Sequence, residues 1–128
     1  EVQAVGKLDA FYQVAAVTDI QLVSGGSNFI YRMKLSDLSF DIERFKYNSG
    51  FFFEYNAEKL EDILPLCRNK CQTMTYFGLE RETVSDFFAS FHPKGIDRVV
   101  PMGKSMDFSL VWDGYDLIRE MSRKISIL

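Results

Sequence analysis

The chain alternates between strand-like and helix-like segments, and this alternation restricts the folds open to it more than any other feature. Three segments are short and either apolar or rich in Thr and aromatic side chains, which is typical of strands: residues 51–55, 71–77 and 96–100. Others carry apolar side chains at the spacing of a helix face: residues 56–67, residues 80–91 and the stretch after Gly114. Strands linked through helices usually lie parallel, with right-handed crossovers. The pattern predicts an α/β fold with a small, mostly parallel sheet covered by helices.

The first fifty residues add one more helix and one more strand to this prediction. Residues 7–18 are expected to form a helix, whose buried face combines four side chains at helical spacing: Leu8, Phe11, Tyr12 and Ala15. Residues 29–35 alternate apolar and polar side chains, which indicates a strand with one side exposed to solvent. A short amphipathic segment follows at residues 38–45. The run Phe51–Tyr55 is nearly all apolar, and such a strand is expected to be covered on both faces.

Length and composition place the chain among ordinary globular domains. With 128 residues and 14.8 kDa it is expected to form a single α/β domain spanning residues 1–128. The hydrophobic fraction is 47% and the charged fraction 26%, which excludes a disordered or fibrous chain. No apolar run approaches the ~18 residues of a membrane span. With two cysteines and no secretion signal, the cytoplasm is the expected location.

The charge distribution argues against nucleic acid as a partner. Residues 1–64 carry six Lys and Arg against ten Asp and Glu, a net charge of −4, whereas residues 65–128 carry nine against eight, a net charge of +1. Neither half contains a basic stripe of the kind that binds nucleic acid. A cationic amphipathic helix, which a membrane-surface role would require, is not visible in the sequence either.

The residue types that carry out catalysis do not form a recognisable constellation. Cys67 and Cys71 are four residues apart, which fits neither the common zinc sites nor redox motifs, so we interpret both as structural thiols. The single histidine, His92, follows a predicted helix, where a cation interacts well with the helix dipole. The turn cluster Ser24–Ser27 lacks the Lys-Ser/Thr of a phosphate-binding loop. We therefore predict no catalytic residue and no metal site in this chain.

One long loop combines unusual residues. The segment from Asp97 to Asp116 contains a strand end, glycines, several aspartates and the only tryptophan, Trp112. Loops at the carboxyl ends of strands are where α/β proteins build their sites. A purely structural role, in which Trp112 fixes a wrapping loop, explains the composition equally well.

The same region resembles a known enzyme family. The run Gly95-Ile96-Asp97-Arg98-Val99-Val100-Pro101-Met102-Gly103, followed by Trp112-Asp113-Gly114 and Leu117-Ile118, is similar to the C-terminal end of the LuxC-type long-chain acyl-CoA reductases, members of the aldehyde dehydrogenase superfamily. The run Cys71-Gln72-Thr73-Met74-Thr75-Tyr76-Phe77-Gly78 resembles the strand before the penultimate helix of that family. The resemblance is clearest from Phe51 onward, whereas residues 1–50 match only in layout.

This resemblance implies a fragment of a larger reductase. The family reduces a fatty acyl thioester to an aldehyde with a nicotinamide cofactor, usually NADPH, through a cysteine thiolate that first takes the acyl group. Its nucleophile and dinucleotide-binding region lie upstream of the segment matched here, so the chain alone is expected to be inactive, to bind no cofactor, and to require the remainder of the parent catalytic domain as its partner. The transferred expectation is that Trp112, Asp113 and Gly114 belong to a closing loop beside the acyl pocket, with Asp113 holding the loop through an Asx-type turn.

Two interpretations remain open. The chain starts at Glu1 without an initiator Met, which agrees with a fragment. Alternatively, it is a stand-alone α/β binding or oligomerisation module that associates through its apolar tail, Ile125–Leu128. These hypotheses imply two further candidate partners, a second copy of the chain or an acyl-transferring protein. Acyl chain length, the choice between NADPH and NADH, and oligomeric state do not follow from the residues.

Overall fold

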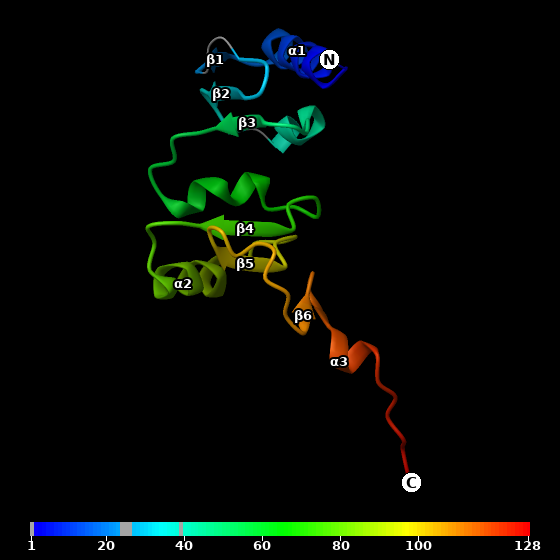
Figure 1. Ribbon diagram of the computed structural model, residues 1–128. Helices are drawn as coiled ribbons and strands as arrows, with labels where there is room; N and C mark the ends of the chain where they lie inside the picture. The colour runs from blue at the N-terminus through cyan, green and yellow to red at the C-terminus, as the bar shows by residue number, and fades with distance from the viewer. Residues whose placement is uncertain (1, 24–26, 39) are drawn as a thin grey trace. The chain divides into compact units, whose positions relative to one another are not determined.

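The chain forms two compact units, Glu1–Leu66 and Cys67–Leu128. The computed structural model describes residues 2–23, 27–38 and 40–128, so most of the turn cluster Ser24–Ser27 lies outside the described residues (Figure 1). Helices and strands are present in both units, so the predicted mixture of α and β structure is confirmed. The expectation that residues 1–128 form a single domain stays a prediction.

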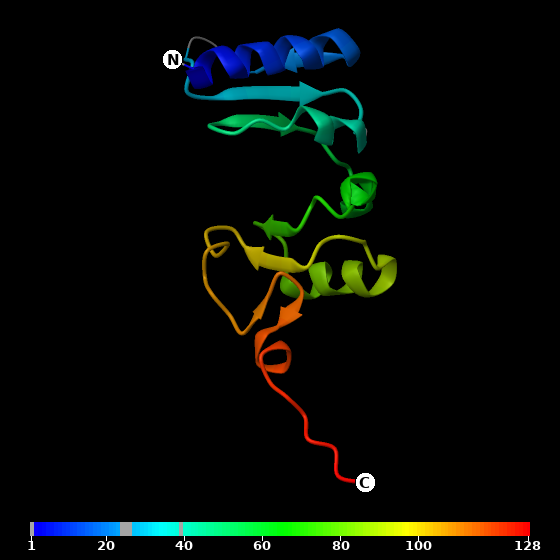
Figure 2. The same ribbon diagram turned by 90° about the vertical axis from the view of Figure 1, so that its right-hand side faces the viewer.

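The first unit contains a three-stranded sheet with a helix beside it. Its elements are α1 (Val2–Val17), β1 (Ile20–Leu22), β2 (Tyr31–Leu35), the 3-10 helix η1 (Phe40–Phe45), β3 (Phe51–Glu54) and the 3-10 helix η2 (Leu60–Leu66). In the strand order β1-β2-β3, β1 runs antiparallel to β2 and β2 runs parallel to β3. Figure 2 shows α1 extending alongside the strands β1 and β2. Strand β1 was not predicted, because three residues are too short to show a pattern.

The buried face of α1 differs from the predicted one. Val14 and Lys7, seven residues apart, are the buried side chains of this helix, whereas Leu8, Tyr12 and Ala15 are exposed and Phe11 is half-buried. The helix therefore buries a different stripe from the predicted one, and the buried residues of β2 are Met33 and Leu35. The prediction failed because it ranked positions by hydrophobicity and so excluded Lys7. A long aliphatic stem allows a lysine to be buried when its ammonium finds acceptors.

Two predictions for residues 51–67 are also corrected. Phe51 is buried, but Phe52 is about half exposed, so β3 is covered on one face instead of two. The helix expected over residues 56–67 is a 3-10 helix confined to Leu60–Leu66. Pro65 has no N–H to donate and lies inside this segment, which disfavours a regular α-helix. The carboxylate of Asp62, the third residue of this helix, accepts from the N–H groups of Glu58 and Lys59, which directly precede it.

The second unit is built on a strand–helix–strand crossover. Its elements are β4 (Thr73–Tyr76), α2 (Arg81–Phe91), β5 (Arg98–Pro101), β6 (Val111–Trp112), β7 (Tyr115–Asp116) and α3 (Leu117–Glu120). Strands β4 and β5 pair in parallel, as predicted, with Thr73 opposite Arg98. Helix α2 buries Val84 and Phe87, leaves Phe91 exposed, and ends at His92, which has a left-handed backbone (φ 44°).

The strands of the described residues are distributed over more than one sheet. They form the three-stranded sheet of the first unit, the parallel pair β4–β5 and the antiparallel hairpin β6–β7. Parallel and antiparallel pairings are therefore both present, and a mostly parallel sheet is not confirmed. The mixed α/β class, however, is what the alternating pattern predicted.

Candidate functional site

The loop that follows β5 is held in place by one arginine. Arg98, in β5, donates from its guanidinium to the main-chain carbonyl oxygens of Ser105 and Asp107, and its Nη2 lies 3.4 Å from the carbonyl oxygen of Lys104. Two turns add main-chain hydrogen bonds within the loop, because the N–H of Lys104 donates to the carbonyl of Pro101 and the N–H of Asp107 donates to the carbonyl of Lys104. A planar cation with five N–H donors can bind several carbonyls at once. Arg98 therefore fixes the conformation of residues 104–107.

Trp112 packs against the same guanidinium. The Cζ atom of Arg98 lies 4.2 Å from the centre of the Trp112 ring, within the range of a cation–π interaction. The Phe108 ring stacks on Trp112 with a centroid distance of 5.3 Å and an interplanar angle of 29°. We refer to Arg98, Phe108 and Trp112 as the Arg98 cluster. The cluster joins a strand, a loop and a hairpin into one arrangement, and the half-buried Trp112 has two neighbours already in contact with its ring.

Asp113 and Gly114 form the turn of the hairpin β6–β7. They are the two residues between the paired positions Trp112 and Tyr115, and both have positive φ angles, 51° and 81°. A two-residue turn with positive φ at both positions is the preferred connection for a twisted hairpin, and Asp-Gly is a favoured sequence for it. A Cβ on Gly114 would lie 3.1 Å from the Asp97 carboxyl carbon, so the turn also passes close to the start of β5. The three predicted site residues thus occupy consecutive hairpin positions.

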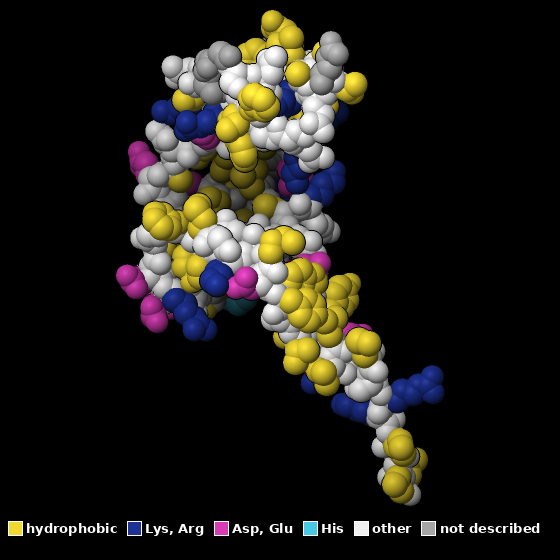
Figure 3. All heavy atoms as spheres, in the orientation of Figure 1, with side chains coloured by type: hydrophobic (Ala, Val, Ile, Leu, Met, Phe, Trp, Pro, Cys, Tyr) yellow, Lys and Arg dark blue, Asp and Glu magenta, His cyan; other side chains and the backbone are white. Residues whose placement is uncertain are grey.

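Apolar side chains gather on this loop and hairpin without cover from the described residues. Met106 is 86% exposed and Phe108 is 70% exposed. Four further apolar side chains have smaller but still large exposed fractions: Met102, Leu110, Val111 and Tyr115. Figure 3 shows hydrophobic side chains clustered over the region of β6. We call this set the apolar loop surface. Exposed apolar patches of this kind, with polar groups fixing the backbone beneath them, are typical of binding surfaces.

The cysteines and the histidine do not supply an activated nucleophile. Burial raises the pKa of the Cys67 thiol, with a smaller contribution from the nearby Cys71, so the thiolate is disfavoured at neutral pH. Cys71 is half-buried. His92 is exposed, and its main-chain N–H donates to the carbonyl of Phe88 at the end of α2. Within the described part of the chain, no group of three or more His, Cys, Asp or Glu residues is arranged to hold a metal ion.

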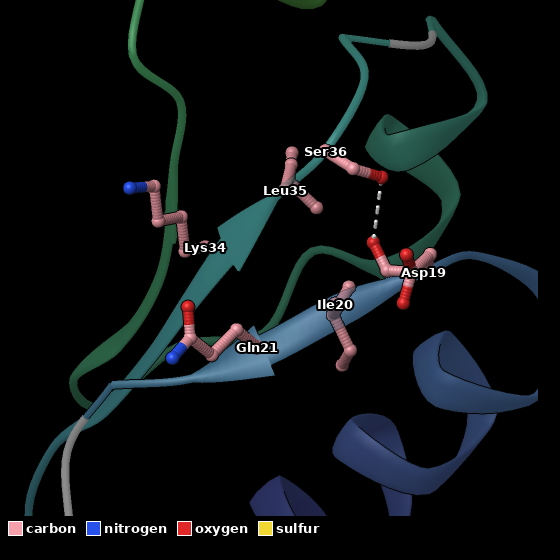
Figure 4. Close-up of a pocket in the computed structure, with 6 residues that line it drawn as sticks. All are labelled: Asp19, Ile20, Gln21, Lys34, Leu35 and Ser36. Atoms are coloured by element: carbon pink, nitrogen blue, oxygen red, sulfur yellow. Dashed lines mark hydrogen bonds between the residues drawn. The ribbon is translucent and has the colours of Figure 1, made fainter.

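A hollow of about 270 Å³ lies at the end of the β1–β2 ladder (Figure 4). Register places Gln21 opposite Lys34, and the Ser36 hydroxyl donates to the main-chain carbonyl of Asp19 over 3.1 Å. The apolar side chains of Ile20 and Leu35 also line it. The hollow combines the half-buried Lys34 with the exposed carboxylate of Asp19 and the exposed amide of Gln21, so it lacks the single charge sign that would select one ligand. We assign it no function.

A more apolar hollow of about 200 Å³ lies elsewhere in the first unit. Its lining comes from β2, η1, β3 and η2, and includes Leu35, Ile42, Phe53 and Ile63. Glu54, also at this hollow, is paired with Arg32 on the neighbouring strand. The hollow is therefore bounded by two strands and two 3-10 helices.

Sequence reasoning missed two residues that organise the molecule. Arg98 stood within the run that carried the family resemblance, but nothing in the local pattern shows that its side chain reaches residues 104–107. Lys7 is charged, so the spacing of apolar positions alone does not assign it to the buried face of its helix. A signal was present at Lys7, since it is seven residues from Val14, on the same helical face.

Comparison with protein-family profiles, with curated proteins and with solved structures found no significant match for this chain. Over the described residues, no helix combines the length and the hydropathy that crossing a membrane requires. The functional assignment therefore depends on the residues and on the geometry of the apolar loop surface.

Proposed function

We propose that the chain is the C-terminal part of the catalytic domain of a LuxC-type long-chain acyl-CoA reductase, and that its apolar loop surface contributes to the wall of the acyl pocket. The observation that supports this proposal is a set of exposed apolar side chains on a backbone that Arg98 holds in one conformation. A fixed apolar wall suits an aliphatic chain, because each methylene buried against it contributes about 0.8 kcal/mol. Trp112, Asp113 and Gly114 form the hairpin that ends this wall.

The crossover β4–α2–β5 is compatible with the same assignment. In the proposed parent, these parallel strands would belong to a larger, mostly parallel sheet of the aldehyde dehydrogenase type. The remainder of that catalytic domain is then the partner of this chain, and the cytoplasm is its compartment. The cysteine that takes the acyl group is expected in that remainder, because desolvation of Cys67 opposes thiolate formation in this chain.

The nicotinamide cofactor of such a parent does not fit this chain. The one strand-to-helix crossover of the second unit has Phe77-Gly78-Leu79-Glu80 between β4 and α2, with a single glycine instead of the Gly-rich turn that approaches a pyrophosphate. Glu80 is the N-cap residue of α2, so a carboxylate stands where a phosphate would bind. We therefore assign NADPH binding to the parent enzyme outside this segment, and derive no step that involves the cofactor here.

The test of the acyl wall uses the intact parent enzyme. Trp112→Ala removes the largest ring of the hairpin and should raise KM for long acyl-CoA substrates about tenfold more than for short ones, because lost apolar contact scales with the buried length of the chain. Phe77→Ala is the matched control, since Phe77 is an exposed aromatic residue outside the loop. Equal KM changes for long and short substrates would assign Trp112 a structural role only and refute the proposal for this residue.

A second candidate function is supported by the C-terminal tail. Ile125, Ile127 and Leu128 are almost fully exposed, as the hypothesis of an oligomerisation module requires. This hypothesis predicts that the chain alone associates, and that Ile125→Ser with Ile127→Ser restores a monomer in sedimentation experiments.

A reading frame that extends several hundred residues upstream and contains a nucleophilic cysteine would favour the reductase. Micromolar binding of NADPH to this chain alone would refute the assignment of cofactor binding to the rest of the parent.

A further inference from the structure

A hollow of about 230 Å³ in the second unit is lined by side chains of both α2 and the strands β4 and β5. Six residues line it: Tyr76, Arg81, Val84, Ser85, Phe88 and Val99. None of them belongs to the apolar loop surface. The hollow is therefore separate from the proposed acyl wall, and a ligand bound there is independent of the proposed function.

The geometry of the elements explains why these residues meet. Four of the lining residues belong to α2 and follow the spacing i, i+3, i+4 and i+7: Arg81, Val84, Ser85 and Phe88. This spacing places all four on one face of the helix. On the sheet, burial alternates along β4, so that Tyr76 shares a face with Met74. Val99 of β5 pairs with Met74, and so lies on that face as well. The hollow is thus the incompletely filled end of the contact between helix and sheet.

The polar groups at this hollow are not used by the protein itself. Within the described part of the chain, the guanidinium of Arg81 and the hydroxyls of Tyr76 and Ser85 take part in no hydrogen bond or ion pair. The other lining atoms come from Val84, Phe88 and Val99, which are apolar. One cation and two hydroxyls beside an apolar floor form the usual composition of a small-molecule site. Arg81 is the one charged residue among those that line the hollow, and its guanidinium favours an anionic ligand.

We propose that this hollow binds a small carboxylate that carries one compact apolar group. The carboxylate would accept from the guanidinium of Arg81, whose paired N–H groups match the two carboxylate oxygens, and from a hydroxyl. The apolar group would lie against Val84, Phe88 and Val99. The volume is below the 300–1,000 Å³ of sites for drug-sized ligands, so the ligand is restricted to about the size of benzoate.

The experiment titrates the full chain with sodium benzoate and follows amide and methyl chemical shifts by NMR. Benzoate should bind with a Kd of about 1 mM, as its few heavy atoms allow, and should shift the resonances of Val84, Phe88 and Val99. Benzylamine, which has the same ring and the opposite charge, should not shift them. Equal binding of benzylamine and benzoate, or no benzoate-induced shifts at these residues, would overturn the proposal without any variant.

Variants then assign the roles within the site. Arg81→Gln should weaken benzoate binding at least about tenfold, because a charge-assisted pair is lost. Arg123→Gln is the matched control, since it makes the same change at an exposed tail position and should leave Kd unchanged. Ser85→Phe fills the hollow from an exposed helix position and should abolish binding while α2 keeps its shifts. Retained benzoate affinity in either Arg81→Gln or Ser85→Phe would place binding elsewhere and overturn the assignment.

Discussion

Lys7 is the residue whose removal should damage the first unit most. Its side chain is only 3% exposed, and its ammonium donates to the main-chain carbonyls of Phe29 and Ser49 over 2.9 Å each, and also to that of Asn28. These acceptors come from two turns that flank β2 and β3, so one side chain of α1 connects the helix to both turns. Nζ also lies 5.6 Å from the centre of the Tyr31 ring.

Lys7→Met keeps the aliphatic stem and removes the donor. The three acceptors belong to exposed residues and the hydrogen bonds are part-buried, so we use the net contribution of about 1 kcal/mol for each hydrogen bond, which gives a loss of about 3 kcal/mol. A small domain has about 5–15 kcal/mol of stability in total, so the change should be large. The same substitution at the exposed Lys59 should change the unfolding free energy by less than about 0.5 kcal/mol.

Hydrogen exchange measures the effect at single amides. In Lys7→Met the amide of Val14 in α1 should exchange about a hundredfold faster, since each 1.4 kcal/mol corresponds to tenfold. The amide of Phe87, in the second unit, serves as the internal reference, and urea unfolding measures the global loss. If Lys7→Met costs no more than Lys59→Met, the carbonyl contacts at Lys7 contribute nothing to stability and the reasoning is refuted.

Three further measurements test other local features. Gly95→Ala should destabilise the chain by more than about 2 kcal/mol in urea unfolding, because φ is +83° and the new Cβ would lie 2.0 Å from the Arg68 carbonyl oxygen. Gly78→Ala, where φ is +73° and the space around the new Cβ is open, should cost about 1 kcal/mol. Equal costs for the two variants would contradict the predicted clash. At pH 8 a thiol reagent should label Cys71 well before Cys67, because burial raises the pKa of the Cys67 thiol, and faster labelling of Cys67, as read by peptide mass spectrometry, would contradict its burial. Arg32 holds the pKa of Glu54 below its ordinary value, so the stabilisation by this exposed pair is complete above the ordinary pKa and is lost as pH falls through the lowered one. Arg32→Gln should return the pKa of Glu54 toward its ordinary value in a carboxyl NMR titration, and an unchanged titration would refute the pairing.

The parts of the fold that the sequence predicted correctly are those set by neighbouring residues. Helix α2 ends at His92, before Pro93, where the sequence placed a break, and its face contains Val84 and Phe87 as the spacing indicated. The parallel pairing of β4 with β5 followed from the intervening helix. In each case the feature is determined by residues that are close together in the sequence, so the local sequence pattern can predict it.

The parts that the sequence did not predict depend on contacts between distant residues. Lys7 reaches carbonyls 21 to 42 positions away, and this determines which face of α1 is buried. Apolar spacing on the helix favoured a stripe through Leu8 and Tyr12 because it took no account of a lysine that finds main-chain acceptors. The pattern also could not indicate whether β3 and β4 share a sheet, since strand partners are chosen by the whole fold.

The candidate site shows the same division between local and distant information. Asp113-Gly114 between short apolar segments is a hairpin signal that can be recognised in the sequence, and the structure has a hairpin there in place of the expected Asx-type loop. The ring of Trp112, expected to face an acyl chain, packs on Arg98 and Phe108. A cation held at main-chain carbonyls beneath an aromatic pair makes the loop conformation independent of any ligand. If an acyl chain binds here, it therefore meets a preformed wall, and its binding should not require ordering of residues 104–107.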